Sequence, residues 1–174
     1  MKVLGIDPGV EGAVALLCAE DGGLIRVMDM PVVDVRVGKT ARHRIASSSL
    51  AAMLKSFAAD HVVIEHVQGR PTDVPTRAGE LCRASGIVEG IIAALGIPLT
   101  IVQPQAWRRA MGVALPAGST APQRKEASRQ RALQLWPAHA AWFLRKMDAD
   151  RAEAALIARW GVMCAGLGGM EKAA

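Results

Sequence analysis

The stretch that decides the fold is KVLGIDPGVEG, residues 2–12. Its apolar start predicts a buried strand that ends on the carboxylate of Asp7. The glycines that follow predict a tight turn, and residues 13–18 and 24–28 predict two more strands joined by a hairpin turn. The chain is therefore expected to open with antiparallel strands beside one acidic residue.

Acidic residues also end a second apolar run and begin the last helical segment. Residues 61–67 predict a strand in which the apolar run 61–64 ends on Glu65, and Asp150 and Glu153 lie near the start of a predicted helix over residues 148–164. Glu153 begins the apolar face of that helix, so its side chain is expected to point inward. An unpaired buried charge is very costly, so these acids together predict a shared cation site.

The other elements alternate between helix and strand. Helices are expected at residues 45–58, 77–95, 104–111 and 123–136, and a short strand at residues 99–102. Residues 31–39 predict an exposed loop with a basic end, and small residues at Ala84, Gly86 and Gly90 predict close packing against another element. The order predicts an α/β fold, with a mixed five-stranded central sheet and helices on both faces.

Composition narrows the class of protein. The chain has 174 residues, of which 51% are hydrophobic, so disorder is excluded. No apolar run reaches the roughly 18 residues that a membrane helix needs, and no signal peptide is evident, which favours a cytoplasmic protein.

Cys18, Cys82 and Cys164 predict buried, reduced thiols, and the scattered histidines do not favour zinc. One domain over residues 1–165 is expected, with a flexible tail at 166–174.

Basic residues gather in two stretches of a chain with a net charge of +5. They are Arg36, Lys39, Arg42 and Arg44 in the first, and Arg108, Arg109, Arg124, Lys125, Arg129 and Arg131 in the second. A basic surface around an acidic pocket suits a polyanionic substrate whose chemistry needs a divalent metal. The alternative is a solvated surface in an arginine-rich protein.

The acids point to one kind of cation. Two carboxylates ~5 Å apart repel by roughly 3 kcal/mol at an effective dielectric of ~20, so a cluster of four favours a bound divalent ion. Oxygen ligands without a histidine or cysteine cluster favour Mg²⁺, with Mn²⁺ as a substitute. Two such ions would clamp the attacking water and the leaving oxygen of a phosphodiester. Alternatively, Asp148 and Asp150 cap the helix while Glu153 pairs with Arg151 or another cation.

With these motifs in order, the chain resembles the RuvC-type Holliday junction resolvases of the RNase H-like superfamily, over about residues 1–165. The motifs are GIDPG at residues 5–9 with Gly12, VVIE at 62–65, RASG at 83–86 and DRAEA at 150–154. The resemblance implies an RNase H-like fold and a homodimer. It also implies Mg²⁺-dependent cleavage of four-way DNA junctions, which leaves 5′-phosphates.

The resemblance also implies residue roles. Asp7, Glu65, Asp150 and Glu153 match the family's metal ligands, although a glutamate at the last position departs from the usual aspartate, and Asp148 is a substitute if the register shifts by two. Lys125 matches a catalytic or phosphate-contacting lysine. The expected DNA contacts are Arg70, Arg77, Arg108, Arg109, Arg124, Lys125 and Arg129. Residues 66–71 lack the aromatic residue that many resolvases stack at the junction centre, and Arg70 or His66 could replace it.

Other functions compete with a branched-DNA nuclease. A non-catalytic protein that binds branched DNA could keep the fold, and a related nuclease could act on RNA–DNA hybrids or linear DNA. An actin- or Hsp70-like ATPase opens with a similar first motif, but its two lobes need a longer chain, so no nucleotide cofactor is expected. The tryptophans at positions 107, 136, 142 and 160 predict core packing rather than a stacking platform, although Trp142 and Phe143 could instead cover a dimer or DNA surface.

Overall fold

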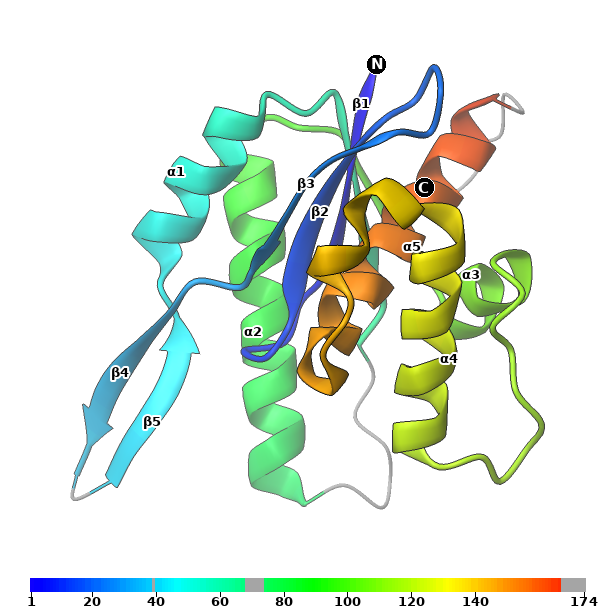
Figure 1. Ribbon diagram of the computed structural model, residues 1–174. Helices are drawn as coiled ribbons and strands as arrows, with labels where there is room; N and C mark the ends of the chain where they lie inside the picture. Colours follow the sequence, from blue (N-terminus) through cyan, green and yellow to red (C-terminus); the bar gives the residue numbers. More distant parts are fainter. Residues whose placement is uncertain (39, 68–73, 167–174) are drawn as a thin grey trace.

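The central sheet has five strands in the order β3-β2-β1-β6-β7, with β1 in the middle (Figure 1). The computed structural model describes residues 1–38, 40–67 and 74–166. The five strands are β1 (Lys2–Asp7), β2 (Ala13–Cys18), β3 (Leu24–Asp29), β6 (His61–Glu65) and β7 (Leu99–Val102). β1 pairs antiparallel with β2 and parallel with β6. The mixed five-stranded sheet that the sequence predicts is therefore confirmed.

Helices cover both faces of this sheet. One face packs against α1 (Ser47–Phe57) and α2 (Pro75–Ala94). The other face packs against α5 (Ala149–Gly166), with α3 (Pro104–Ala110) and α4 (Ala121–Leu135) beside it. Two short 3₁₀ helices, η1 (Pro137–Trp142) and η2 (Lys146–Asp148), join α4 to α5.

The alternation of side chains along β1 sets which residues reach each face. Leu4 and Ile6 belong to the core on the α1 and α2 side, whereas Val3 belongs to the core beneath α5. Successive side chains of a strand point to opposite faces, so Asp7 shares the α5 face with Val3. On β6, Val63 packs under α5, and Glu65 lies two residues further along the same face.

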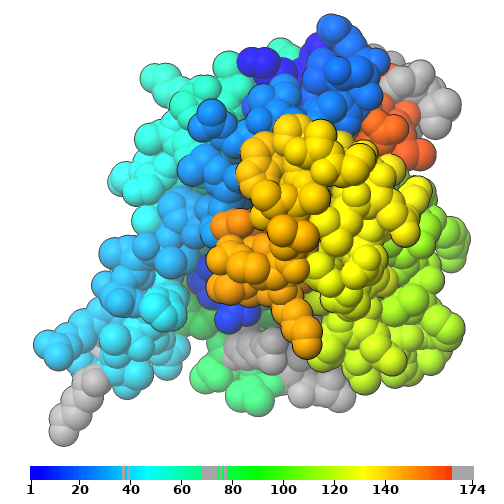
Figure 2. Space-filling model, viewed as in Figure 1, coloured from blue at the N-terminus to red at the C-terminus, as the bar shows by residue number. Residues whose placement is uncertain are grey.

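The interval between β3 and α1 differs from the prediction. Residues 31–39 are expected as a loop, but β4 (Val32–Val37) pairs antiparallel with β5 (Thr40–Ile45) in a separate two-stranded sheet. This ribbon projects away from the body of the molecule at the lower left of Figures 1 and 2. Valines alternate with charged residues along β4, and this period of two favours a strand even where neither face is fully covered.

Two further predictions are wrong. Gly86 and Gly90 do not mediate close packing, because a Cβ at either position would meet nothing within 4 Å in the described part of the chain. Only Ala84 of that stripe is buried. All three cysteines are free, as expected, but Cys82 is exposed while Cys18 and Cys164 are half-buried.

The C-terminal helix continues to Gly166, two residues beyond its predicted end. Residues 167–174, most of the predicted tail, lie outside the described residues. Among the residues that are described, no helix combines the length and apolarity needed to cross a membrane.

Candidate metal centre

The closest approach of α5 to the sheet is made at glycines. A Cβ at Gly5 would lie 2.3 Å from the backbone of Ala154 and of Ala158. A Cβ at Gly161 would lie 2.6 Å from Val63. The helix can lie this close to the strands only because these two positions lack side chains. The first turn of α5 is thereby held beside the C-terminal end of β1.

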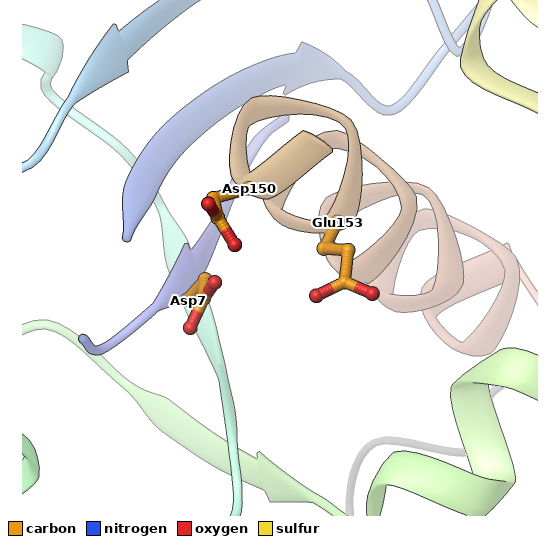
Figure 3. Close-up of side chains that lie close together, drawn as sticks. All are labelled: Asp7, Asp150 and Glu153. Atoms are coloured by element: carbon orange, nitrogen blue, oxygen red, sulfur yellow. The ribbon is translucent and has the colours of Figure 1, made fainter. Parts of the chain in front are cut away.

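This close packing brings three of the predicted acids together. One carboxylate oxygen from each of Asp7, Asp150 and Glu153 lies within 4.8 Å of the other two. Asp7 comes from the end of β1, and the other two side chains project toward it from the first turns of α5 (Figure 3). Glu153 is 7% exposed, as the predicted inward face requires. The group offers only carboxylate oxygens, the ligands that Mg²⁺ prefers.

The fourth acid, Glu65, lies beside this group and has its own partners. Trp107 Nε1 donates a hydrogen bond of 3.0 Å to Glu65 Oε2, and Arg108 Nη2 lies 3.4 Å from Oε1. The Arg108 guanidinium also stacks over the Trp107 ring, 4.9 Å from its centre, and reaches Glu153 at 3.8 Å. Arg108 therefore bridges Glu65 to the three-carboxylate group.

Helix α4 supplies two more partners at matching spacing. Lys125 Nζ lies 3.0 Å from Asp150 Oδ1, and Ser128 Oγ donates a 3.1 Å hydrogen bond to Glu153 Oε1. Residues three apart share one face of a helix, so the Lys125–Ser128 pair on α4 lies opposite the Asp150–Glu153 pair on α5. The capping box of Thr120 and Gln123 begins α4 one turn earlier.

The carboxylates are hard to ionise together in this environment. Burial, and then the charges of Glu153, Asp150 and Glu65, hold the pKa of Asp7 well above its ordinary value. Burial raises the pKa of Glu153 to about 7, although Arg108 opposes the shift. Burial likewise raises the pKa of Glu65. A divalent cation would relieve both the burial and the repulsion, so the donor set and its electrostatics fit such an ion.

The surroundings favour the charged form of Lys125, whereas they disfavour the charged form of the carboxylates. Partial burial lowers the pKa of its ammonium group, but the hydrogen bond and charge of Asp150 outweigh burial and hold the pKa above its ordinary value. Lys125 is therefore charged at neutral pH and offsets part of the negative charge of the carboxylates.

Asp148 is not arranged as a substitute ligand. It is 1% exposed and lies 2.8 Å from Arg145 Nη2 and 3.4 Å from Arg151 Nη1. Burial raises the pKa of Asp148, but the hydrogen bonds from Arg145 outweigh it and hold this pKa below its ordinary value. Arg151 pairs with Asp148 and with Asp29. The cation beside Glu153 is instead Arg108, at 3.8 Å, so of the alternative partners for Glu153 the structure shows another cation and not Arg151 among the described residues.

The predicted DNA-binding residues differ in their surroundings. Arg109 is exposed, and the guanidinium of Arg124 donates to the Ser119 carbonyl. The Arg129 guanidinium is occupied by Glu126 and by the carbonyls of Phe143 and Leu144. Arg70 lies outside the described residues, and of Arg77 only its place in α2 is described.

Sequence reasoning missed several interactions at the site. It assigned Trp107 to the core, and this ring is indeed fully buried, but its indole N–H also holds Glu65. The sequence does not mark Ser128 as a residue of the site. Its one signal is its position three residues after Lys125, which matches the spacing of Asp150 and Glu153.

A groove of about 460 Å³ adjoins the acids on one side. Its lining includes Lys125 and Asp150 of the candidate metal centre, and Met30 and Val32 at the base of the β4–β5 ribbon. Charged residues of both signs also line it: Arg145, Glu11, Asp29 and Asp148. The groove therefore adjoins both the candidate metal centre and the base of the ribbon.

The fold is similar to that of known resolvases. No family model and no curated protein matches the chain. The solved structure of Thermus thermophilus RuvC in complex with a Holliday junction substrate is 16% identical, with a TM-score of 0.60, and the match covers 97% of this chain and 98% of that one. The fowlpox virus Holliday junction resolvase is also 16% identical, with a TM-score of 0.58 and coverage of 98% and 99%.

These matches define the class of fold. The chain has the RNase H-like α/β fold of RuvC and related Holliday junction resolvases, over nearly its whole length. The fold resemblance that the sequence motifs indicate is therefore confirmed. At 16% identity these similarities establish the fold alone.

Proposed function

We propose that this protein is an endonuclease for branched DNA that depends on a divalent metal, Mg²⁺ in the first instance with Mn²⁺ as a substitute. The observation that carries the proposal is the group of Asp7, Asp150 and Glu153 carboxylates, converging within 4.8 Å on a resolvase-like fold. An acidic pocket of this kind would hinder a protein that only binds phosphate, because it repels the ligand. It suits a protein that positions cations against a scissile phosphate.

The four acids would hold the metal in this proposal. Asp7, Asp150 and Glu153 form its ligand set, and Glu65 joins them from the end of β6. When bound, divalent ions would supply a water of lowered pKa and positive charge against the phosphate. Trp107 and Arg108 would fix the orientation of Glu65, since both donate to its carboxylate.

The reaction would be hydrolysis of a phosphodiester without a covalent intermediate. Water adds to phosphorus, the bond from phosphorus to the 3′ oxygen breaks, and that oxygen leaves with a proton, so the products carry a 5′-phosphate and a 3′-hydroxyl. Lys125 is placed to stabilise negative charge on the phosphate, because its ammonium group lies at the edge of the acids.

The DNA would be held by basic residues around the site. Arg109 on α3 and Arg124 on α4 are candidates, and Arg70 and Arg77 remain candidates on the basis of the sequence. Arg129 is a weaker candidate, because its guanidinium already holds the segment after α4. A four-way junction cut symmetrically needs two active sites, and each chain has one, so a homodimer is part of the proposal. Light scattering would test it.

The test is a panel of substrates cut by the wild type and by Asp7→Asn. Four-way junctions, forks, RNA–DNA hybrids and linear duplexes are incubated with Mg²⁺, with Ca²⁺ or with EDTA. We expect cleavage of branched substrates with Mg²⁺ only, and loss of cleavage but retained binding in Asp7→Asn. Asp21→Asn is the matched control, because Asp21 lies in an exposed turn and its amide replacement should cut normally.

The same panel separates the competing functions. A wild type that binds junctions tightly but cuts nothing with any metal would favour a non-catalytic binding protein. Preferred cleavage of the hybrid or of linear DNA would favour a different nuclease of the same fold. Equal cleavage by wild type and Asp7→Asn would exclude Asp7 as a ligand.

A further inference from the structure

The β4–β5 ribbon has features that neither the core nor the candidate metal centre explains. It extends from the body as an arm (Figure 2), and the buried side chains at its base are those of Met30 and Ile45. Val32 and Val33, nearer the base than the tip, are still 45% and 48% exposed. Isolated two-stranded hairpins are marginal in water, so an arm of this kind suggests a partner surface.

The charge of the ribbon identifies the kind of partner. Within residues 32–45 the sequence has four lysines and arginines against a single acid, Asp34. Asp34 is already paired with His43 at 2.7 Å. An exposed, positively charged ribbon matches a polyanion rather than an apolar protein surface.

The register places arginines on both faces of the ribbon. Arg42 and Arg44 lie opposite Val35 and Val33, whereas Arg36 lies opposite Ala41 and so points to the other face. The face with Arg42 turns toward α2, where Glu80 lies 3.0 Å from Arg42 and 3.9 Å from Arg44. One carboxylate thus faces two guanidinium groups. Exposed ion pairs of this kind are worth only about 0–1 kcal/mol, so a phosphate can compete for Arg42.

The position of the ribbon connects it to the candidate metal centre. The groove beside the acids is lined by Lys125 and Asp150 and also by Met30 and Val32, next to which the ribbon starts. In Figure 1 the ribbon leaves the body below α1 and projects to the lower left, toward the end of the molecule to which β1 runs, with α4 on the opposite flank. DNA whose scissile phosphate lies at the acids could therefore continue past the groove to the ribbon.

We propose that the β4–β5 ribbon grips the phosphate backbone of a duplex arm of the substrate, with Arg36 and Arg42 as the residues that bind phosphate. This assignment rests on the proposed nuclease function and adds a second DNA-binding surface, away from the acids. A two-stranded ribbon is narrow enough to follow a major groove, and arginines bound to phosphate fix position without reading sequence.

The test is the salt dependence of binding, measured by fluorescence anisotropy with Asp7→Asn in EDTA, so that no DNA is cut. A four-way junction with long arms is titrated at several salt concentrations. The ribbon variant carries Arg36→Ala and Arg42→Ala in addition to Asp7→Asn. It should bind more weakly, and its slope of log affinity against log salt should be smaller by about 2, since each phosphate that is no longer neutralised lowers the slope by roughly 0.9. Junctions with arms too short to reach the ribbon should bind Asp7→Asn and the ribbon variant equally.

Two control variants make the result specific. Lys2→Ala with Lys55→Ala removes the same charge from exposed sites near the opposite end of the sheet, and should leave the slope unchanged. Arg36→Lys with Arg42→Lys keeps the charge and should restore most of the slope. Circular dichroism and thermal melting confirm that each variant is folded.

The outcomes that overturn the proposal are distinct. If the wild type cuts junctions but the ribbon variant binds long-armed junctions with the wild-type slope, the ribbon does not bind DNA and the nuclease function stands. If the ribbon variant instead changes the oligomeric state without weakening DNA binding, the ribbon is a surface between copies of the chain. If the wild type binds no branched DNA, both proposals fail.

Discussion

The positions of the acids at the candidate metal centre follow from the strands and the helix that carry them. Asp7 and Glu65 end strands whose apolar residues are fully buried, and Glu153 lies on the inward face of α5. These positions follow from hydrophobic periodicity, and sequence reasoning predicts them. The hydrogen bonds of Trp107 with Glu65 and of Ser128 with Glu153 join residues 42 and 25 positions apart. No local pattern encodes such pairs, because they depend on how α3, α4 and α5 pack.

The raised pKa of Glu153 predicts how stability depends on pH without metal. Its folded-state pKa of about 7 lies above the ordinary value of 4.5, so the folded state binds this proton more tightly. The contribution of Glu153 to the free energy of unfolding is then largest below about pH 4.5 and is lost as the pH rises toward 7. A shift of this size corresponds to about 3 kcal/mol.

Glu153→Gln should remove that pH-dependent destabilisation. In EDTA, we expect the variant to be more stable than the wild type at pH 8, and this advantage to be much smaller at pH 5. Urea denaturation at the two pH values measures the difference, and added Mg²⁺ should stabilise the wild type more than the variant at pH 8. An equal free energy of unfolding for the two proteins at pH 8 would mean that Glu153 carries no such strain.

Lys125 should affect the chemical step more than the fold. Removing one positive group that stabilises the transition state typically costs about 10²-fold or more in rate, so Lys125→Ala should lower the single-turnover rate on a four-way junction by about that factor. Lys125→Arg keeps the charge and should retain more activity. Lys55→Ala removes an exposed lysine near the far end of the sheet and serves as the control. A wild-type rate in Lys125→Ala would leave this lysine with a structural role only.

At the scale of elements, the packing of α5 on β1 decides whether the acids meet. Gly5 lets the backbone of α5 lie directly on the strand. Gly5→Ala would place a methyl group 2.3 Å from that backbone, and overpacking of this kind costs about 3 kcal/mol or more. The helix would have to move, and Asp150 and Glu153 would move with it.

The matched control is a glycine in an open helical position. A methyl group at Gly86 in α2 would meet nothing within 4 Å among the described residues, and alanine in a helix is favoured over glycine by about 0.5–1 kcal/mol. Thermal melting should therefore show a large decrease in stability for Gly5→Ala and a neutral or small increase for Gly86→Ala. Equal melting temperatures for the two variants would contradict the close packing of α5 on β1.

The same scale shows which elements are predictable from sequence. Strands β1, β2, β6 and β7 have buried apolar side chains, and the mostly exposed β3 follows β2 through a turn; all five are found within about two residues of where the sequence predicts them. The ribbon of β4 and β5 is missed because its residues are mostly exposed on both faces. The alternation of valine and charge along β4 favours a strand, but the charged, glycine-containing end of the segment suggests a loop when it is considered alone. Its basic residues, rather than its pattern, are the sequence signal that marks it.

At the scale of the whole molecule, basic and acidic features form a consistent arrangement. The acids lie where β1 ends, Lys125 and Arg108 lie beside them, and the adjoining groove is also lined by residues at the base of a basic ribbon. Under the proposed function, these basic residues would hold the polyanion whose phosphate lies at the acids.

The central claim is that distant acids form one cation site, and diffraction from a crystal soaked in Mn²⁺ tests it most directly. The anomalous signal of Mn²⁺ locates the ion without reference to activity. We expect a peak beside the carboxylates of Asp7, Asp150 and Glu153, and no peak there in Asp7→Asn. A wild-type crystal with Mn²⁺ bound elsewhere and none among these three side chains would contradict the account.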